Sequence, residues 1–74
     1  MSTVIRQHKE NNYYVTMEVE NVWGNDIYIV EVCPCYDNNM CGYPLQKMTY
    51  SIKDKKNAEA TFRRYIKKYC KGEF

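Results

Sequence analysis

The sequence predicts a small α+β domain, a three- to four-stranded antiparallel β-meander with one C-terminal helix packed on one face. Two observations predict this class. Apolar and polar residues alternate over 13–23 and again over 48–52, which is the period of strands with one buried face. The period then becomes helical, and one apolar stripe holds Ala58, Phe62, Tyr65, Ile66 and Tyr69. A strand that runs directly into a helix places that helix back across the sheet.

Length and charge set the broad class. The 74 residues suit a single domain over 1–74. There is no apolar run long enough to span a bilayer and no signal-peptide core, so we expect a cytoplasmic protein. Residues 1–44 carry two Lys or Arg against six Asp or Glu, a net charge of −4, whereas residues 45–74 carry nine against three, a net charge of +6. This asymmetry is typical of a protein with a polar partner or with two different faces.

The N-terminal segment, 1–12, is expected to form either an edge strand, over 3–8, or a loose terminus. The strand would turn back through its pair of asparagines, which tolerate the left-handed conformation of tight turns. Residues 13–52 are then expected to form the antiparallel sheet.

The clearest strand covers 13–23, and its odd-numbered residues face the core. A return strand covers 27–36, with Val30 and Val32 pointing inward. Trp23 is expected to close the hairpin end of the core while staying partly exposed.

The register of this hairpin decides what Glu31 faces. Core residues must pair with core residues, so the tight turn is expected at residues 24–25 or 25–26. The first turn pairs Glu31 with Glu18, and the second pairs it with Glu20. Like charges directly opposite one another destabilise a sheet.

A last strand is expected over 43–52, and the helix over 55–71. Asp54 is the candidate N-cap, because its carboxylate can accept a hydrogen bond from a free N–H of the first turn. Gly72 lies where a chain leaving a helix often adopts the left-handed conformation.

An acidic surface that also bears tyrosines is expected on the sheet face away from the helix. Lys47 has the parity to offset part of its charge, and the remaining misfit is typical of a binding site. We interpret it as a docking surface for a cationic groove of a protein, with tyrosines adding contact area. An ordinary solvated face is the competing interpretation. The candidate partner-binding residues are Tyr14, Glu18, Glu20, Asp26, Glu31, Tyr36, Asp37 and Tyr43.

A basic stripe is expected on the helix, at positions three and four residues apart. Such residues are candidates for phosphate contacts, which would make the chain a nucleic-acid-binding domain. Cations near a helix C-terminus also complement the macrodipole without any ligand. The residues of this alternative site are Arg64, Lys67, Lys68 and Lys71.

The sequence does not indicate an enzyme. His8 is the only histidine, the three glycines are scattered, and nothing builds a pocket around the paired carboxylates. We therefore expect no catalytic residues, no metal and no cofactor. The four cysteines, Cys33, Cys35, Cys41 and Cys70, are expected as reduced thiols, while zinc binding and a disulfide such as Cys35–Cys41 stay open.

Resemblances extend this interpretation. Residues 49–54, followed by Ala58 and Phe62, are similar to the end of the integrase arm-type and plant-factor DNA-binding domains, which read DNA with Arg and Lys on an exposed sheet. Here that sheet face carries glutamates instead. The chain as a whole resembles small phage or mobile-element inhibitors of the anti-CRISPR kind in its size, its Lys-, Asn-, Tyr- and Ile-rich composition and its acidic face.

The second resemblance implies a non-enzymatic inhibitor that occupies the cationic groove of a host nucleic-acid enzyme, in the host cell cytoplasm. The expected partner is thus a protein, with nucleic acid as the alternative and no membrane. The outer-face residues Ile27, Ile29 and Cys33 are also compatible with a homodimer seam.

Overall fold

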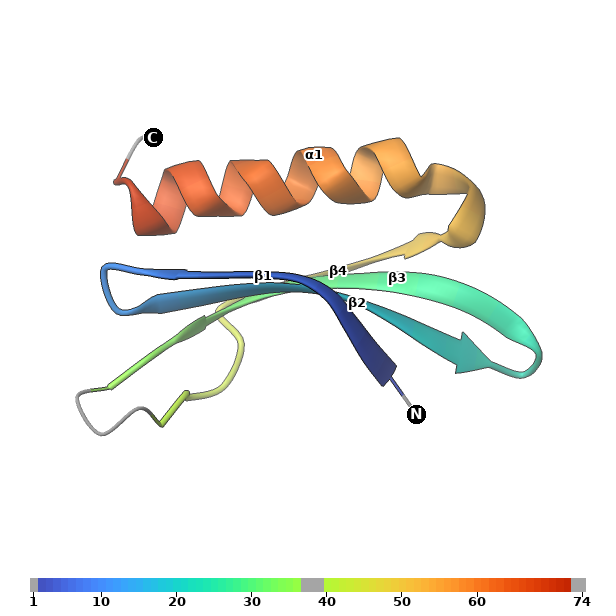
Figure 1. The fold of residues 1–74 in the computed structure, drawn as a ribbon, viewed down its shortest axis with the longest axis horizontal. Helices are drawn as coiled ribbons and strands as arrows, with labels where there is room; N and C mark the ends of the chain where they lie inside the picture. Colours follow the sequence, from blue (N-terminus) through green and yellow to red (C-terminus); the bar gives the residue numbers. More distant parts are fainter. Residues whose placement is uncertain (1, 37–39, 73–74) are drawn as a thin grey trace.

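The described residues form four antiparallel strands in one sheet, and a helix lies across one face of it (Figure 1). The computed structural model describes residues 2–36 and 40–72. The strands, neighbours in chain order, are β1 (Ser2–Glu10), β2 (Tyr13–Val22), β3 (Asn25–Pro34) and β4 (Gln46–Ser51). One 3-10 turn, η1 (Ile52–Asp54), leads into α1 (Lys55–Tyr65), which continues as the π-helical segment η2 (Ile66–Cys70). The predicted meander with one C-terminal helix is confirmed.

The N-terminal segment is the edge strand β1, so of the two expectations for it the strand is correct. Asn11 and Asn12 adopt φ of 52° and 68°, the paired positive values that a two-residue hairpin turn requires. A bulge after Val4 shifts the register and turns Arg6 toward the helix, where its guanidinium lies 3.3 Å from the carboxylate of Glu59.

The tight turn between β2 and β3 begins one residue earlier than the sequence predicts. Trp23 and Gly24 form it, with φ of 53° and 80°, so both expected turns, at 24–25 and 25–26, are wrong. The side chain of Asn21 holds the turn at this place, because its Oδ1 accepts a hydrogen bond from the backbone N–H of Gly24 at 3.3 Å. The pairing still sets core residues opposite core residues, as the parity argument requires.

Trp23 is 96% exposed, so the expectation that it closes the core is wrong. Its place in the turn removes it from the inward-facing row of β2. Tyr28 of β3 is buried in the core instead and lies opposite Val19 in the register.

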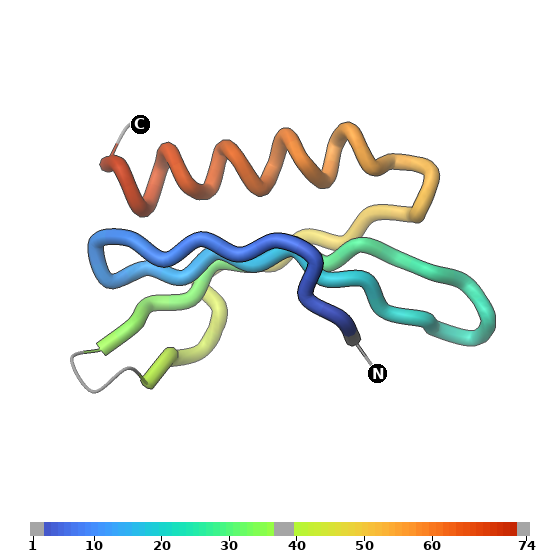
Figure 2. The backbone as a smooth tube through the Cα atoms, in the orientation of Figure 1, coloured from blue at the N-terminus to red at the C-terminus, as the bar shows by residue number. Residues whose placement is uncertain are grey.

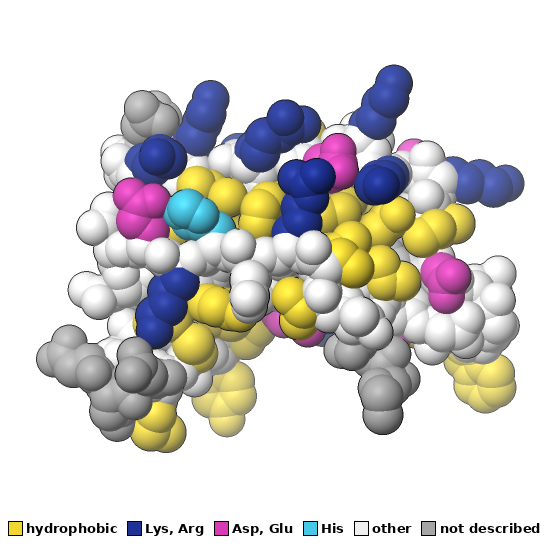
Figure 3. Space-filling model, viewed as in Figure 1, with side chains coloured by type: hydrophobic (Ala, Val, Ile, Leu, Met, Phe, Trp, Pro, Cys, Tyr) yellow, Lys and Arg dark blue, Asp and Glu magenta, His cyan; other side chains and the backbone are white. Residues whose placement is uncertain are grey.

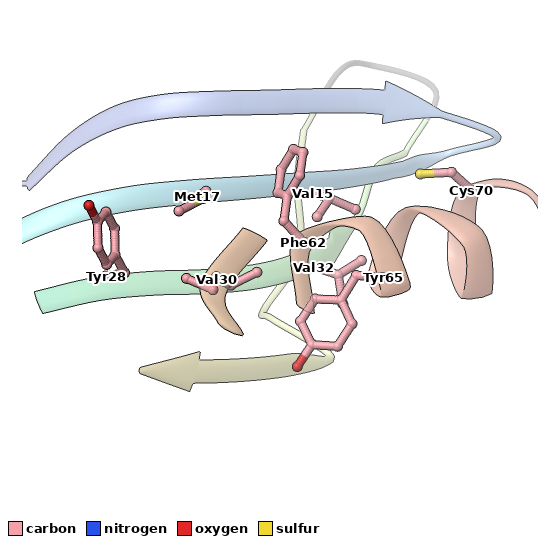
Figure 4. Packing of buried hydrophobic residues seen from close by; sticks show 9 residues of the cluster. Val15, Met17, Tyr28, Val30, Val32, Phe62, Tyr65 and Cys70 are labelled. Carbon is pink, nitrogen blue, oxygen red and sulfur yellow. The ribbon is translucent and has the colours of Figure 1, made fainter. Parts of the chain in front are cut away.

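The core lies between the helix and the inner face of β2 and β3 (Figure 4). Val15, Met17, Val30 and Val32 are fully buried there, which confirms the predicted inward parity of both strands. The helix contributes the buried side chains Ala58, Phe62, Tyr65 and Cys70.

The ends of the helix follow the sequence signals only in part. Asp54 occupies the N-cap position, but it makes no capping hydrogen bond; the hydroxyl of Ser51 donates to its carboxylate at 3.5 Å. The predicted cap bond is therefore wrong. At the other end Gly72 adopts φ of 68°, as predicted. Cys70, the last residue of the π-helical segment, is also fully buried in the core, although it is not part of the predicted apolar stripe.

The last strand, β4, is shorter than predicted. It begins at Gln46 rather than at residue 43, and Pro44 lies in the irregular connection before it. Within the connection from β3, Cys35 and Cys41 form an isolated antiparallel bridge. Figure 2 shows this connection on the side of the sheet away from the helix. None of the helices in the described ranges is long and apolar enough to cross a membrane.

Candidate protein-binding face

The strand register places one set of side chains on the sheet face opposite the helix, which we call the outer face. None of the described helices or named strands covers it (Figure 1). Its members are Val4, Gln7 and Lys9 of β1, Tyr14, Thr16, Glu18 and Glu20 of β2, Ile27, Ile29, Glu31 and Cys33 of β3, and Lys47 and Thr49 of β4. The structure thus brings together four of the predicted partner-binding residues.

Glu31 does not face another glutamate. It pairs with Thr16 on one side and with Lys47 on the other, so the predicted opposition to Glu18 or Glu20 is wrong. The cause is the earlier turn, which shifts the register of β3 along β2. Lys47, expected to offset part of the acidic charge, stands directly opposite Glu31.

The outer face has a buried centre that the sequence did not reveal. Ile29 is only 5% exposed although it lies on the sheet face away from the helix. Its register neighbours are Glu18 on β2 and Thr49 on β4, and Val4 lies beyond Glu18 on β1. Long polar side chains can cover apolar surface with their stems while their heads stay in water. Ile29 therefore offers little surface to the homodimer seam considered above.

The carboxylates around this centre repel one another. Glu18 and Glu20 lie two residues apart on one strand, and Glu31 is diagonal to Glu18, a spacing of roughly 7–8 Å in antiparallel sheets. Partial burial raises the pKa of Glu18 above its ordinary value of 4.5, and the charges of Glu31 and Glu20 add to the shift. Lys47 acts in the opposite direction without cancelling it. The outer face therefore holds negative charge that its own cations do not fully compensate.

Two predicted residues make contacts within the sheet. The hydroxyl of Tyr14 donates to the side-chain carbonyl of Gln7 on β1, which fixes the ring on the outer face. Asp26 is exposed beside the Trp23-Gly24 turn and accepts a hydrogen bond from the side-chain amide of Asn21 at 3.1 Å.

The connection between β3 and β4 presents the other predicted tyrosines. Tyr36 is 59% exposed and Tyr43 is 93% exposed. Both belong to the connection between β3 and β4, which lies on the outer side of the sheet (Figures 1 and 2). Asp37, also predicted for this surface, lies outside the described residues.

The basic stripe occupies the opposite side of the molecule. Figure 3 shows Lys and Arg side chains gathered along the helix. Arg64, Lys67 and Lys71 are exposed, whereas Lys68 is half-buried, with its Nζ 5.4 Å from the ring centroid of Tyr69. Lys68 is therefore engaged with an aromatic ring beside the other three cations.

A shallow depression on the helix adds a cation that the sequence argument missed. It is lined by Ala60, Arg63, Arg64 and Lys67. Arg63 could have been predicted as a member of this surface from its position three residues after the small Ala60, since this spacing puts both residues on one helical face.

In residues 2–36 and 40–72, no three His, Cys, Asp or Glu side chains are grouped to hold a metal ion. No protein-family model matches the sequence, and no curated protein or solved structure matches it at a significant level.

Proposed function

We propose that this protein is a non-enzymatic protein-binding module that docks its outer face against a cationic groove of a nucleic-acid enzyme. The observation that carries the proposal is the carboxylate group Glu18, Glu20 and Glu31 around the buried Ile29, with the pKa of Glu18 raised. A native fold has no need of repelling carboxylates on a partly buried face, and a cationic partner would relieve that repulsion.

The surrounding residues suit this mode of binding. Charge complementarity speeds association and excludes partners of the wrong sign. The exposed rings of Tyr36 and Tyr43 offer large contact area at low entropic cost at the edge of the face. A groove that normally holds phosphates would meet carboxylates and phenolic hydroxyls in their place. We extend the proposal to an inhibitor carried by a phage or mobile element and acting in the host cytoplasm.

Charge reversal on the outer face tests the proposal. The purified protein is assayed as an inhibitor of nucleic-acid cleavage against a panel of purified RNA-guided nucleases. We expect at least one nuclease to be inhibited, and we expect Glu18→Lys with Glu31→Lys to abolish that inhibition. The matched control, Arg64→Glu with Lys68→Glu on the helix, should inhibit as well as the wild type. Full inhibition by the outer-face variant would overturn the assignment of the face, and no inhibition of any nuclease would overturn the proposed partner class.

A nucleic-acid-binding function is the second candidate, and the depression lined by Arg63, Arg64 and Lys67 favours it. Phosphate contacts from an exposed helix are independent of sequence and sensitive to salt. Under this alternative the helix variant, rather than the outer-face variant, would lose function.

A further inference from the structure

Two of the four cysteines face each other across the connection between β3 and β4. Cys35 and Cys41 are partners in an isolated antiparallel bridge, and their Sγ atoms lie 2.9 Å apart. The flanking residues make the hydrogen bonds: Tyr36 N–H donates to the carbonyl of Met40, and Gly42 N–H donates to the carbonyl of Pro34, both at 2.8 Å.

This bonding pattern defines the narrow type of antiparallel pair, in which opposed residues carry no hydrogen bonds to each other and their Cα atoms lie about 4.5 Å apart. That separation falls within the range observed for disulfides, roughly 4.4–6.8 Å between Cα atoms. The backbone thus already holds both residues where a disulfide needs them.

The two chain segments that carry the thiols, which we call the arms, are held in place by backbone hydrogen bonds to the sheet. The N–H of Cys35 donates to the carbonyl of Asn12 in the first hairpin at 2.7 Å, and the N–H of Leu45 donates to the carbonyl of Val32 at 2.8 Å. Gly42 permits the arms to approach, because a Cβ at that position would lie 3.0 Å from the hydroxyl of Tyr36. Bond formation therefore requires little movement of the chain.

The other two cysteines are less suited to this reaction. Cys70 is fully buried on the helix side of the sheet, and its thiol lies 3.9 Å from the carbonyl of Tyr13. Cys33 is half-buried within β3 and pairs with Tyr14 in the ladder. Neither is the register partner of another cysteine.

We propose that Cys35 and Cys41 form a reversible intramolecular disulfide when the protein meets a low-molecular-weight disulfide such as oxidised glutathione. This inference stands on the geometry of the connection and does not depend on the proposed function.

The order of the two steps follows from exposure. Cys41 is exposed, so its thiolate attacks one sulfur of oxidised glutathione, forms a mixed disulfide and releases one glutathione thiolate. Cys35 is buried, and burial together with its hydrogen bond to Cys41 raises its pKa to about 11, so it does not react first. Cys35 then loses its proton to solvent and attacks the sulfur of Cys41, releasing the second glutathione. Two electrons pass from the protein thiols to one glutathione disulfide, which leaves as two thiols.

The expected product links two arms that also carry tyrosines of the candidate surface. Tyr36 directly follows Cys35, and Tyr43 lies two residues after Cys41. The disulfide would join the two segments covalently, with Tyr36 inside the closed loop and Tyr43 just beyond it.

Thiol counting and fragment linkage test the proposal. The folded protein is equilibrated with oxidised glutathione, then denatured, alkylated and cleaved at methionine, which cuts the chain between Met40 and Cys41. We expect the number of free thiols to fall from four to two, and fragments 18–40 and 41–48 to stay joined until a reductant is added. Four remaining thiols, or separate fragments, would overturn the proposal.

Variants with one cysteine replaced by serine identify the partner of Cys41. In Cys35→Ser we expect the fragments to separate and one glutathione to remain on Cys41, because the second attack is lost. In Cys33→Ser, the matched control, the link should persist. Fragments that stay joined in Cys35→Ser would show that Cys33 is the partner and would overturn the assignment. Should Cys35→Ser lose its circular dichroism signal, Cys33→Ser decides the partner, because loss of the link in that variant would make Cys33 the partner and overturn the assignment. The exposed Cys41→Ser variant should then retain all three of its thiols, with no joined fragments.

Discussion

At the scale of single residues, Glu18 connects structure with the candidate function. Its carboxylate lies on a sheet face, between Val4 and Ile29 in the register, rather than at a solvated edge. Burial and the nearby charges of Glu31 and Glu20 raise its pKa. The folded protein thus holds a proton on Glu18 more readily than the unfolded chain does. The free energy of unfolding should then fall as pH rises from the ordinary glutamate value of 4.5 through the raised value.

Glu18→Gln should accordingly stabilise the protein at neutral pH. Glutamine keeps the shape of the side chain and removes the charge, so its advantage should disappear below the ordinary pKa, where the wild-type carboxyl is protonated. Urea unfolding at neutral and acidic pH measures both values. Glu10→Gln is the opposite control: its hydrogen bond with His8 lowers the pKa of Glu10, so this variant should lose stability at neutral pH. A Glu18→Gln variant weaker than the wild type at neutral pH would show that the carboxylate is well compensated.

At the scale of elements, the second hairpin shows where sequence reasoning succeeds and where it fails. Alternation of apolar residues identified both strands and their inward faces, because burial enforces a period of two over many residues. The position of the turn does not follow from the sequence, because several adjacent residues, Gly24 and Asn25 among them, tolerate positive φ. The observed turn is distinguished by one local hydrogen bond, from the N–H of Gly24 to the side chain of Asn21. The alternation of apolar and polar residues does not predict such a bond.

Trp23 breaks two local rules in this turn, being both bulky at positive φ and almost fully exposed. Replacing it with asparagine gives Asn-Gly, the preferred pair for a turn with positive φ at both positions. We expect Trp23→Asn to raise the free energy of unfolding by roughly 0.5–1 kcal/mol, because the left-handed conformation becomes less costly and no buried contact is lost.

Trp23→Ala is the control for this change in chemical denaturation. It removes the ring but leaves a side chain that disfavours positive φ, so its stability should stay close to that of the wild type. A marked loss of stability in both variants would mean that the indole ring contributes to the fold.

The same limits apply to the candidate site. The outer-face location of Glu18, Glu20, Glu31 and Tyr14 followed from parity alone. The buried state of Ile29 did not, because it depends on side chains of three strands lying together. The opposition of Cys35 and Cys41 lies in an irregular connection, where no repeating pattern fixes the pairing.

At the scale of the whole molecule, the basic stripe lies on the helix (Figure 3), whereas the acidic residues lie on the sheet face away from the helix. The residues of the acidic surface belong to the strands, and those of the basic stripe belong to the helix. Because the helix packs on one face of the sheet, the two groups are separated in space as they are along the chain. Each face predicts a different partner. Among the described residues, the outer face combines uncompensated charge with a buried apolar centre and flanking exposed tyrosines, and we therefore propose it as the binding surface.

The measurement that tests this assignment most directly is a titration of the protein against short duplex and single-stranded DNA and RNA, at roughly 50 mM and 200 mM salt. We expect no saturable binding at either salt concentration. The proposed interface is acidic, so it would repel phosphates, and its proposed partner is a protein. Saturable binding that falls steeply with salt and is lost in the Arg64→Glu, Lys68→Glu variant would contradict the account and make the basic helix the functional surface.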